Sequence, residues 1–342
     1  MNAPPSAGVH MRAEIAEASG VFAATLQKSV DARRLDQIAA LHLDQIRAIY
    51  TIARGSSDAA ANILSYEFMR ETGKPMTSLP PSIFSVGRGV DMAGSVSLIV
   101  SQSGSSDDLV RSAYGIREAG GRVIGLINVE GAPVSAACDL VLPLGAGPER
   151  AVPATKSVVG AIAAGMALLG AMRPSYAQRA VASGVAVQKL TGIPHPHQRA
   201  LVAALLRARH VYVIGRDTGY GAAQELALKL KECCALHAEA YSSSEVLHGP
   251  LQLVTNPLLI LILDTEQPDV QPSLDTAEAR FRGAGGTVFR LRPSDAGATN
   301  LTPAAAAAAL LCLTYPLALE TALALGHDPD TPATLSKVTQ TT

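Results

Sequence analysis

The sequence predicts an α/β protein built from two tandem, doubly wound parallel-sheet domains. Continuous apolar runs of strand length alternate with segments of helical periodicity, which is typical of parallel sheets covered by helices on both faces. This pattern then occurs a second time along the chain. The length of 342 residues and the hydrophobic content of 48% are also sufficient for about two domains.

The internal repeat pairs three sets of segments that lie 161 to 165 residues apart. Three matches at a nearly constant offset make a chance match improbable. The first pair is 46–57 and 211–218, which are followed by predicted helices over 59–69 and 222–235. The second pair is 97–104 and 258–265, and the third is 120–124 and 285–289.

Prolines between the two copies indicate where one domain ends and the next begins. Pro174, Pro194 and Pro196 flank a helical segment, because proline disfavours helical backbone in the residue before it. We therefore expect a leader and helix over 1–44, a first domain over 45–175, a connector over 176–198, and a second domain with a C-terminal tail over 199–342.

Composition and charge exclude several classes of function. The 28 basic and 29 acidic residues give a net charge of −1, which disfavours nucleic acid and anionic membranes as partners. The apolar stretches 158–172 and 304–319 are shorter than a membrane span, so we expect buried helices there. The four cysteines show neither metal-ligand nor disulfide spacing, and residues 1–10 do not resemble a signal peptide. These features favour a cytoplasmic protein that holds no metal.

A serine-rich loop is the strongest candidate for binding an anion. Ser101-Gln102-Ser103-Gly104-Ser105-Ser106-Asp107 stands where a predicted strand passes into a helix, so that hydroxyls and backbone N–H groups converge near a positive helix end. The alternative is an ordinary helix cap, since serine and aspartate are favoured there. The number of hydroxyls favours a phosphate site. Nucleotide-binding motifs are missing, which predicts that no ATP or NAD cofactor is used.

One predicted helix carries a candidate acid–base group. Glu225, Lys229 and Glu232 share one helix face, which places an ammonium beside carboxylates; the alternative is a solvated salt-bridge face. His248 precedes a Gly-Pro turn that would fix its direction. We expect His195 and His197 to be surface residues, and by local pattern alone Lys337 would belong to a frayed tail.

Taken together, these segments resemble the isomerase half of glucosamine-6-phosphate synthase and the related stand-alone sugar-isomerase (SIS) enzymes. The resemblance covers almost the whole chain and implies two flavodoxin-like SIS domains. Its motifs are Met11–Ile15, Gly55–Ser57, Ser101–Gly104, Val152–Lys156, Glu225–Glu232, His237–Tyr241, Glu245–Pro250 and Leu335–Val338.

The resemblance also assigns roles. It implies that Glu232 moves a proton between C1 and C2 of a sugar phosphate, that Lys229 supports it at the sugar hydroxyls, that His248 assists ring opening, and that Lys337 reaches the open-chain sugar and can form a Schiff base. It implies a homodimer in which the segment around His248 completes the neighbouring site. The phosphate and sugar would be bound by Ser56, Ser57, Ser101, Gln102, Ser103, Ser106, Val152 and Ser336.

The departures from the synthase guide the expected reaction. Ser105-Ser106 stands where the synthase has Glu-Thr, and no glutaminase domain precedes Met11 in this sequence. We therefore expect release of ammonia from a phosphorylated amino sugar, that is, a glucosamine-6-phosphate deaminase. The alternatives are a deglycase or isomerase acting on another amino-sugar or fructosamine phosphate and, from another class, a non-catalytic phosphosugar-binding regulator. Proton transfer between adjacent carbons needs a positioned carboxylate and no metal.

Overall fold

The structure, a computed structural model, describes residues 6–337 and contains two parallel sheets, one in each half of the chain. The first sheet has the strand order β2-β1-β3-β4-β5, and the second has the order β7-β6-β8-β9. All described strand pairs are parallel. The predicted fold class, two tandem doubly wound domains, is therefore confirmed.

The first half contains five strands and seven α-helices among the described residues. The strands are β1 (Ala48–Ile52), β2 (Met76–Ser78), β3 (Ser95–Ser101), β4 (Arg122–Ile127) and β5 (Leu140–Pro143), and the helices are α1 (Val9–Lys28), α2 (Ala32–Ala40), α3 (Gly55–Thr72), α4 (Ser82–Ser85), α5 (Asp107–Glu118), α6 (Lys156–Met172) and α7 (Pro174–Gln188). A short 3-10 helix, η1, covers Pro133–Ala137.

The second half repeats the order with one strand fewer. Its strands are β6 (His210–Gly215), β7 (His237–Ser242), β8 (Leu259–Leu263) and β9 (Thr287–Leu291), and its helices are α8 (Gln198–Leu205), α9 (Thr218–Cys234), α10 (Gln271–Gly283) and α11 (Pro303–Ala324). Short 3-10 helices lie between them at η2 (Glu245–His248), η3 (Pro250–Thr255), η4 (Pro268–Val270) and η5 (Pro293–Ala296).

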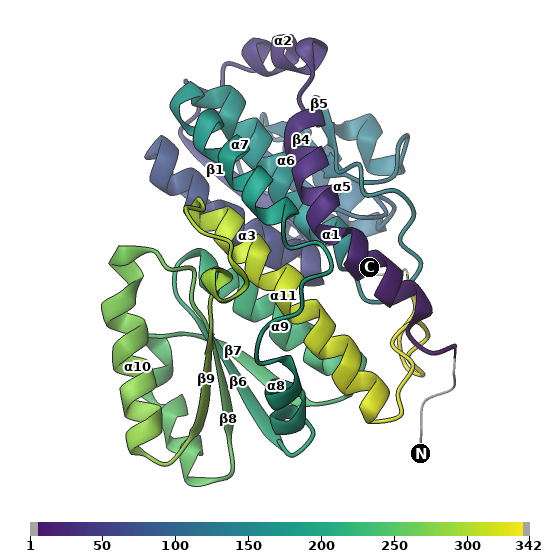
Figure 1. Cartoon of the computed structure of the whole chain (residues 1–342). Helices are drawn as coiled ribbons and strands as arrows, with labels where there is room; N and C mark the ends of the chain where they lie inside the picture. The colour runs from purple at the N-terminus through teal and green to yellow at the C-terminus, as the bar shows by residue number, and fades with distance from the viewer. Residues whose placement is uncertain (1–5, 338–342) are drawn as a thin grey trace.

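Helix α11 joins the two halves. In Figure 1 it runs diagonally, in yellow, between the upper sheet and the lower one, and it packs against α9, α1, α6 and α7. Residues 304–309 are six consecutive, buried alanines, whose small side chains let neighbouring helices approach closely. One hydrophobic cluster consequently spans both halves, while two smaller clusters lie on the outer faces of the sheets.

The two apolar stretches are buried helices, as predicted. They form α6 and most of α11. Among the described residues, α11 alone is long and apolar enough to cross a membrane, but 78% of its most apolar window is buried inside the protein. This is the burial of a core helix.

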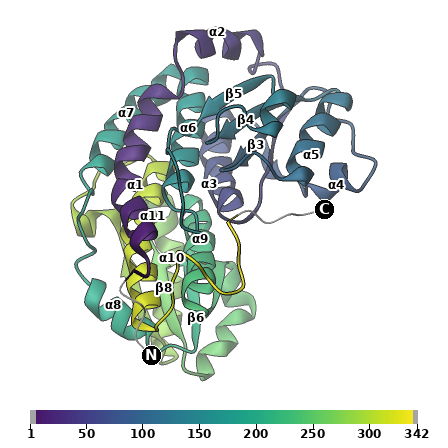
Figure 2. The same cartoon turned by 90° about the vertical axis from the view of Figure 1, so that its right-hand side faces the viewer.

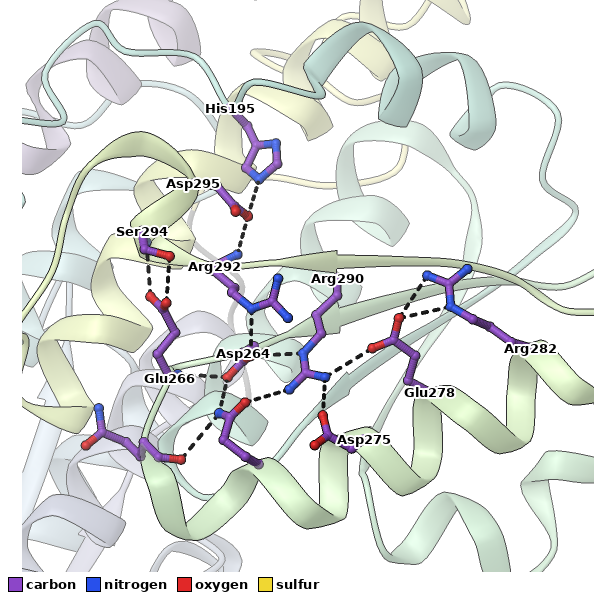
Figure 3. A network of polar contacts seen from close by, with 12 residues as sticks. His195, Asp264, Glu266, Asp275, Glu278, Arg282, Arg290, Arg292, Ser294 and Asp295 are labelled. Atoms are coloured by element: carbon purple, nitrogen blue, oxygen red, sulfur yellow. Dashed lines mark hydrogen bonds and ion pairs between the residues drawn. The ribbon is translucent and has the colours of Figure 1, made fainter.

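The segment expected as a connector begins as a packed helix. Most of 176–198 belongs to α7, which contacts α1 and α6, and the loop that follows leads to α8. The prediction that His195 is a surface residue is wrong, because it is 2% exposed. Its Nε2 lies 3.3 Å from the carboxylate of Asp295, and its Nδ1 accepts from the N–H of His197 (Figure 3). Burial lowers the pKa of His195 despite the nearby Asp295.

A buried carboxylate lies where α3 meets α7 and the start of α11. Glu67 accepts from the Tyr176 hydroxyl at 2.8 Å and from the Ala304 N–H at 3.3 Å. Burial raises the pKa of Glu67 to about 7, although both hydrogen bonds oppose the shift. The folded protein thus holds a proton that the unfolded chain releases at lower pH.

This proton predicts a pH-dependent stability. Because the folded pKa lies above the ordinary value of 4.5, Glu67 contributes most below that value, and the contribution is lost as pH rises toward about 7. Glu67→Gln should flatten the fall in melting temperature over this range, removing about 2–3 kcal/mol of pH-dependent free energy at most. The readout is the slope of melting temperature against pH. The absolute melting temperature is unsuitable, because the substitution also replaces the carboxylate that accepts from the Ala304 N–H.

Tyr176→Phe is the matched comparison. It removes a hydrogen bond that lowers the pKa of Glu67, so the fall in melting temperature with rising pH should become steeper. An unchanged slope in both variants would show that Glu67 does not titrate in this range.

Candidate active site

A cleft of about 380 Å³ brings together most of the residues predicted from the sequence. Its walls come from the turn after β1, the loop after β3, the segment before α6, helix α9 and the C-terminal tail. Figure 2 shows the yellow tail passing α9 toward the first half. Ten of the predicted residues line the cleft: Ser56, Ser57, Ser101, Gln102, Ser103, Ser106, Val152, Glu232, Ser336 and Lys337.

The loop after β3 folds back on itself at Gly104. The Ser101 hydroxyl accepts from the Gly104 N–H at 2.9 Å, and Gly104 has a φ of 61°, which favours glycine. A Cβ at this position would lie 2.5 Å from the Cβ of Ala132, so there is also no room for a side chain. The turn holds the loop at the carboxyl end of the sheet, where ligands of such folds bind.

Ser106 bears on the choice between a helix cap and a ligand site. It occupies the N-cap position of α5, but its side chain makes no capping hydrogen bond. It lines the cleft instead. The geometry therefore does not support the helix-cap interpretation for this hydroxyl and leaves it facing the space where an anion would lie.

An ion pair with a buried carboxylate joins the two loops. Arg54, between β1 and α3, donates to Asp108 Oδ2 through Nε at 3.0 Å and Nη2 at 2.8 Å. The Asp108 side chain is fully buried in the first turn of α5, whereas that of Arg54 is 52% exposed at the cleft. The guanidinium of Arg54 thus lies at the cleft beside the serine-rich loop, and it pairs the charge of the buried Asp108 carboxylate.

The second half uses the equivalent position differently. Asp264 directly follows β8, as Ser101 ends β3, and its buried carboxylate accepts from Arg290, Arg292 and Gln271 (Figure 3). The backbone N–H of Glu266 donates to the same carboxylate. An internal network thus occupies the edge at which the first half presents hydroxyls to a cleft.

Glu232 is held by a lysine buried behind it. Lys229 Nζ contacts Glu232 Oε2 and lies 3.7 Å from Glu225 Oε1, and the Tyr315 hydroxyl donates to Glu225 at 3.2 Å. The side chains of Lys229 and Glu225 are fully buried, whereas that of Glu232 is 25% exposed and lines the cleft. The predicted shared helix face is therefore present, but it is buried rather than solvated.

The electrostatics of this cluster keep Lys229 charged. Burial by itself would lower the pKa of Lys229, yet the carboxylates of Glu225 and Glu232 raise it above its ordinary value. Burial raises the pKa of Glu225 to about 7 against the attraction of Lys229. Lys229 does not line the cleft, so its expected contact with sugar hydroxyls is replaced in this structure by its contact with Glu232.

His248 does not line this cleft either. It ends η2 in the second half and is exposed. Within one chain, the structure therefore does not bring His248 to Glu232.

The tail reaches the cleft with a hydrogen-bonded lysine. Lys337 Nζ donates to the Ala151 carbonyl at 2.6 Å and lies 3.5 Å from Glu149 Oε2. Leu335 and Ser336 line the same wall, and Val338, the last residue of the predicted motif, lies outside the described residues. Sequence reasoning missed Glu149 because no local pattern marks it, although it stands three residues before the Val152–Lys156 motif.

Comparison with known proteins identifies the family. The SIS domain model matches residues 42–171 and 204–289, more than half of the chain. The chain belongs to the SIS-domain family. Relatives include the glutamine–fructose-6-phosphate aminotransferases of Leifsonia xyli, 29% identical over 96% of this chain and 58% of that protein, and Aeropyrum pernix, 33% identical over 78% and 46%. This SIS chain thus spans about half the length of the curated relatives it matches.

Solved structures of SIS proteins have the same fold over nearly their whole length. One from Silicibacter pomeroyi DSS-3, named as a candidate phosphosugar isomerase, is 29% identical with a TM-score of 0.82, covering 94% of this chain and 99% of that one. Glucosamine-6-phosphate deaminase from Thermotoga maritima is 18% identical with a TM-score of 0.72, covering 97% and 100%. At that identity the second likeness shows the fold alone.

The expected phosphate binding by the serine-rich loop of this SIS protein can be tested at Ser106. Ser106→Ala should weaken binding of fructose 6-phosphate and inorganic phosphate about 10- to 100-fold, the loss expected for one hydrogen bond to a charged group. Its melting temperature should be unchanged, because the side chain caps no helix. Ser105→Ala, outside the cleft wall, is the control. Lowered stability with unchanged phosphate affinity would restore the helix-cap interpretation.

Proposed function

We propose that this SIS protein is a phosphosugar enzyme whose reaction is the deamination of glucosamine 6-phosphate to fructose 6-phosphate and ammonia. The observation that carries the proposal is a cleft lined by a hydroxyl-rich loop together with Glu232 and Lys337. The loop suits a phosphate dianion, and the carboxylate suits transfer of a carbon-bound proton. Such a reaction needs no metal or organic cofactor.

The proposed reaction needs only a base and water. In the open-chain sugar, Glu232 takes the proton from C2, and a water molecule donates a proton to the C1 aldehyde oxygen, which gives an enolamine and hydroxide. Return of the proton from Glu232 to C1 leaves a protonated imine at C2. The hydroxide then adds to the imine carbon, the C–N bond breaks, and ammonia and the C2 ketone result. Lys229, behind Glu232, would hold the carboxylate in place through both proton transfers.

The comparisons support the substrate class more than the individual reaction. The aminotransferase relatives act, by name, on fructose 6-phosphate, and the Thermotoga maritima deaminase matches this chain end to end in fold. Isomerisation without deamination is the second candidate, and the Escherichia coli tagatose-6-phosphate ketose/aldose isomerase shares the fold with a TM-score of 0.77 at 18% identity. Assaying ammonia release and ketose formation across amino-sugar, fructosamine and plain sugar phosphates would separate these reactions. Tight binding without turnover would favour a regulator.

A homodimer is part of the proposal. His248 is exposed and away from the cleft of its own chain, which is consistent with its serving the site of a neighbouring subunit. A cytoplasmic location fits cysteines that are all free thiols.

Glu232→Gln tests the proton transfer. The amide keeps the shape but removes the basicity, so kcat should fall about 10²- to 10⁴-fold with little change in substrate binding. Exchange of the C2 hydrogen with solvent, followed by NMR, should fall in parallel. Glu278→Gln is the control, because it replaces a salt-bridged carboxylate on α10 that does not line the cleft. Near-parental turnover and exchange in the Glu232 variant would move the base elsewhere, with Lys337 the next candidate.

Mixed subunits test the shared site. Glu232→Gln and His248→Ala should each be inactive alone, and mixing them should restore part of the activity, because some mixed dimers contain one intact site. Subunit exchange is verified with differently tagged chains. Exchange without recovery would argue that each chain carries its own complete site.

A further inference from the structure

The C-terminal tail is tied to two distant parts of the chain before it reaches the cleft. The Asp328 carboxylate accepts from the Gly8 N–H at 3.0 Å, and the Asp330 carboxylate accepts from the N–H groups of His10 and Met11, each at 2.8 Å. The Val152 N–H donates to the Asp330 carbonyl at 3.3 Å. These contacts fix where the tail begins, but all lie at least six residues before Lys337.

Lys337 forms the far anchor of the same tail. Its Nζ donates to the Ala151 carbonyl and lies within ion-pair distance of Glu149. Between the two anchors, Leu335 and Ser336 form part of the wall of the cleft. The contacts of Lys337 therefore help to place the tail at the wall of the cleft.

The carboxylate of Glu149 accepts hydrogen bonds from the start of α6. Its side chain is fully buried, its Oε1 accepts from the backbone N–H groups of Thr155 at 3.0 Å and Ser157 at 3.1 Å, and its Oε2 accepts from the Ser157 hydroxyl at 2.6 Å. Lys337 is the cation that faces it, so the buried charge has its partner on the tail.

We propose that Glu149 is a positioning residue that docks Lys337 and thereby holds the tail segment 335–337 across the sugar-phosphate cleft. The proposal rests on the function proposed above for its catalytic consequence, but the docking itself does not. It also gives the Val152–Lys156 motif a physical role, because the N–H groups at the start of α6 orient the carboxylate that receives the tail.

Hydrogen–deuterium exchange of the tail separates docking from catalysis. Glu149→Gln should raise exchange in the peptide covering residues 331–337 about 10- to 100-fold, as expected for losing a charged hydrogen bond, and Lys337→Met should do the same. The double variant should exchange no faster than Lys337→Met, because Lys337→Met already removes the contact with Glu149 together with the hydrogen bond to Ala151. Ser157→Ala is the matched control, since it removes one hydrogen bond to the carboxylate but keeps its charge, and tail exchange should stay within about twofold of the parent.

Binding gives a second readout that needs no turnover. Glu149→Gln should weaken binding of fructose 6-phosphate about tenfold while binding of inorganic phosphate at the separate loop stays unchanged. In an active enzyme KM should rise by a similar factor. Parental tail exchange in Glu149→Gln, or an equal increase in Ser157→Ala, would overturn the proposal and reduce Glu149 to a cap of α6. If Glu149→Gln does not fold, parental exchange in Lys337→Met would overturn it equally. Failure to release ammonia from any sugar would refute the deaminase and leave the exchange result standing.

Discussion

The candidate site depends on the ion pairs that the buried Lys229 ammonium makes with two carboxylates. The lysine lies in α9, the helix that packs against both α3 and α11, and so occupies the junction between the two halves. A buried charge without partners would be very costly, and Lys229 avoids this by contacting Glu225 on one side and Glu232 on the other. The contacts of the lysine therefore also fix the direction of Glu232, whose carboxylate belongs to a residue that lines the cleft.

Glu225 is in turn held from the other side of the junction. The hydroxyl of Tyr315, on α11, donates to it, so the two core helices are joined by a polar contact inside an otherwise apolar interface. Removing one member of such a chain leaves the others buried without a partner. The packing of the two halves and the orientation of Glu232 are consequently parts of the same arrangement.

The two sheets have similar strand orders, but the loops at their carboxyl ends differ in what they bind. At the carboxyl end of β3, the chain presents serine hydroxyls to a cleft; at the corresponding end of β8, a buried aspartate is saturated by arginine and glutamine side chains. The arginine and glutamine donors that bind Asp264 are not available to a ligand, whereas the hydroxyls of the first loop belong to residues that line the cleft. The second half contributes to the candidate site through α9 and the tail instead.

The sequence alone determined the fold class, the strand–turn–helix units and the serine loop, because strand burial and helix periodicity are local properties of the chain. It also predicted that Glu225, Lys229 and Glu232 share a face, since helix geometry requires it. It could not show that this face is buried, that His195 is covered, or that Glu149 receives Lys337. Those outcomes depend on which elements pack together, and contacts between residues almost 190 positions apart leave no local pattern to read. Tertiary structure decided them.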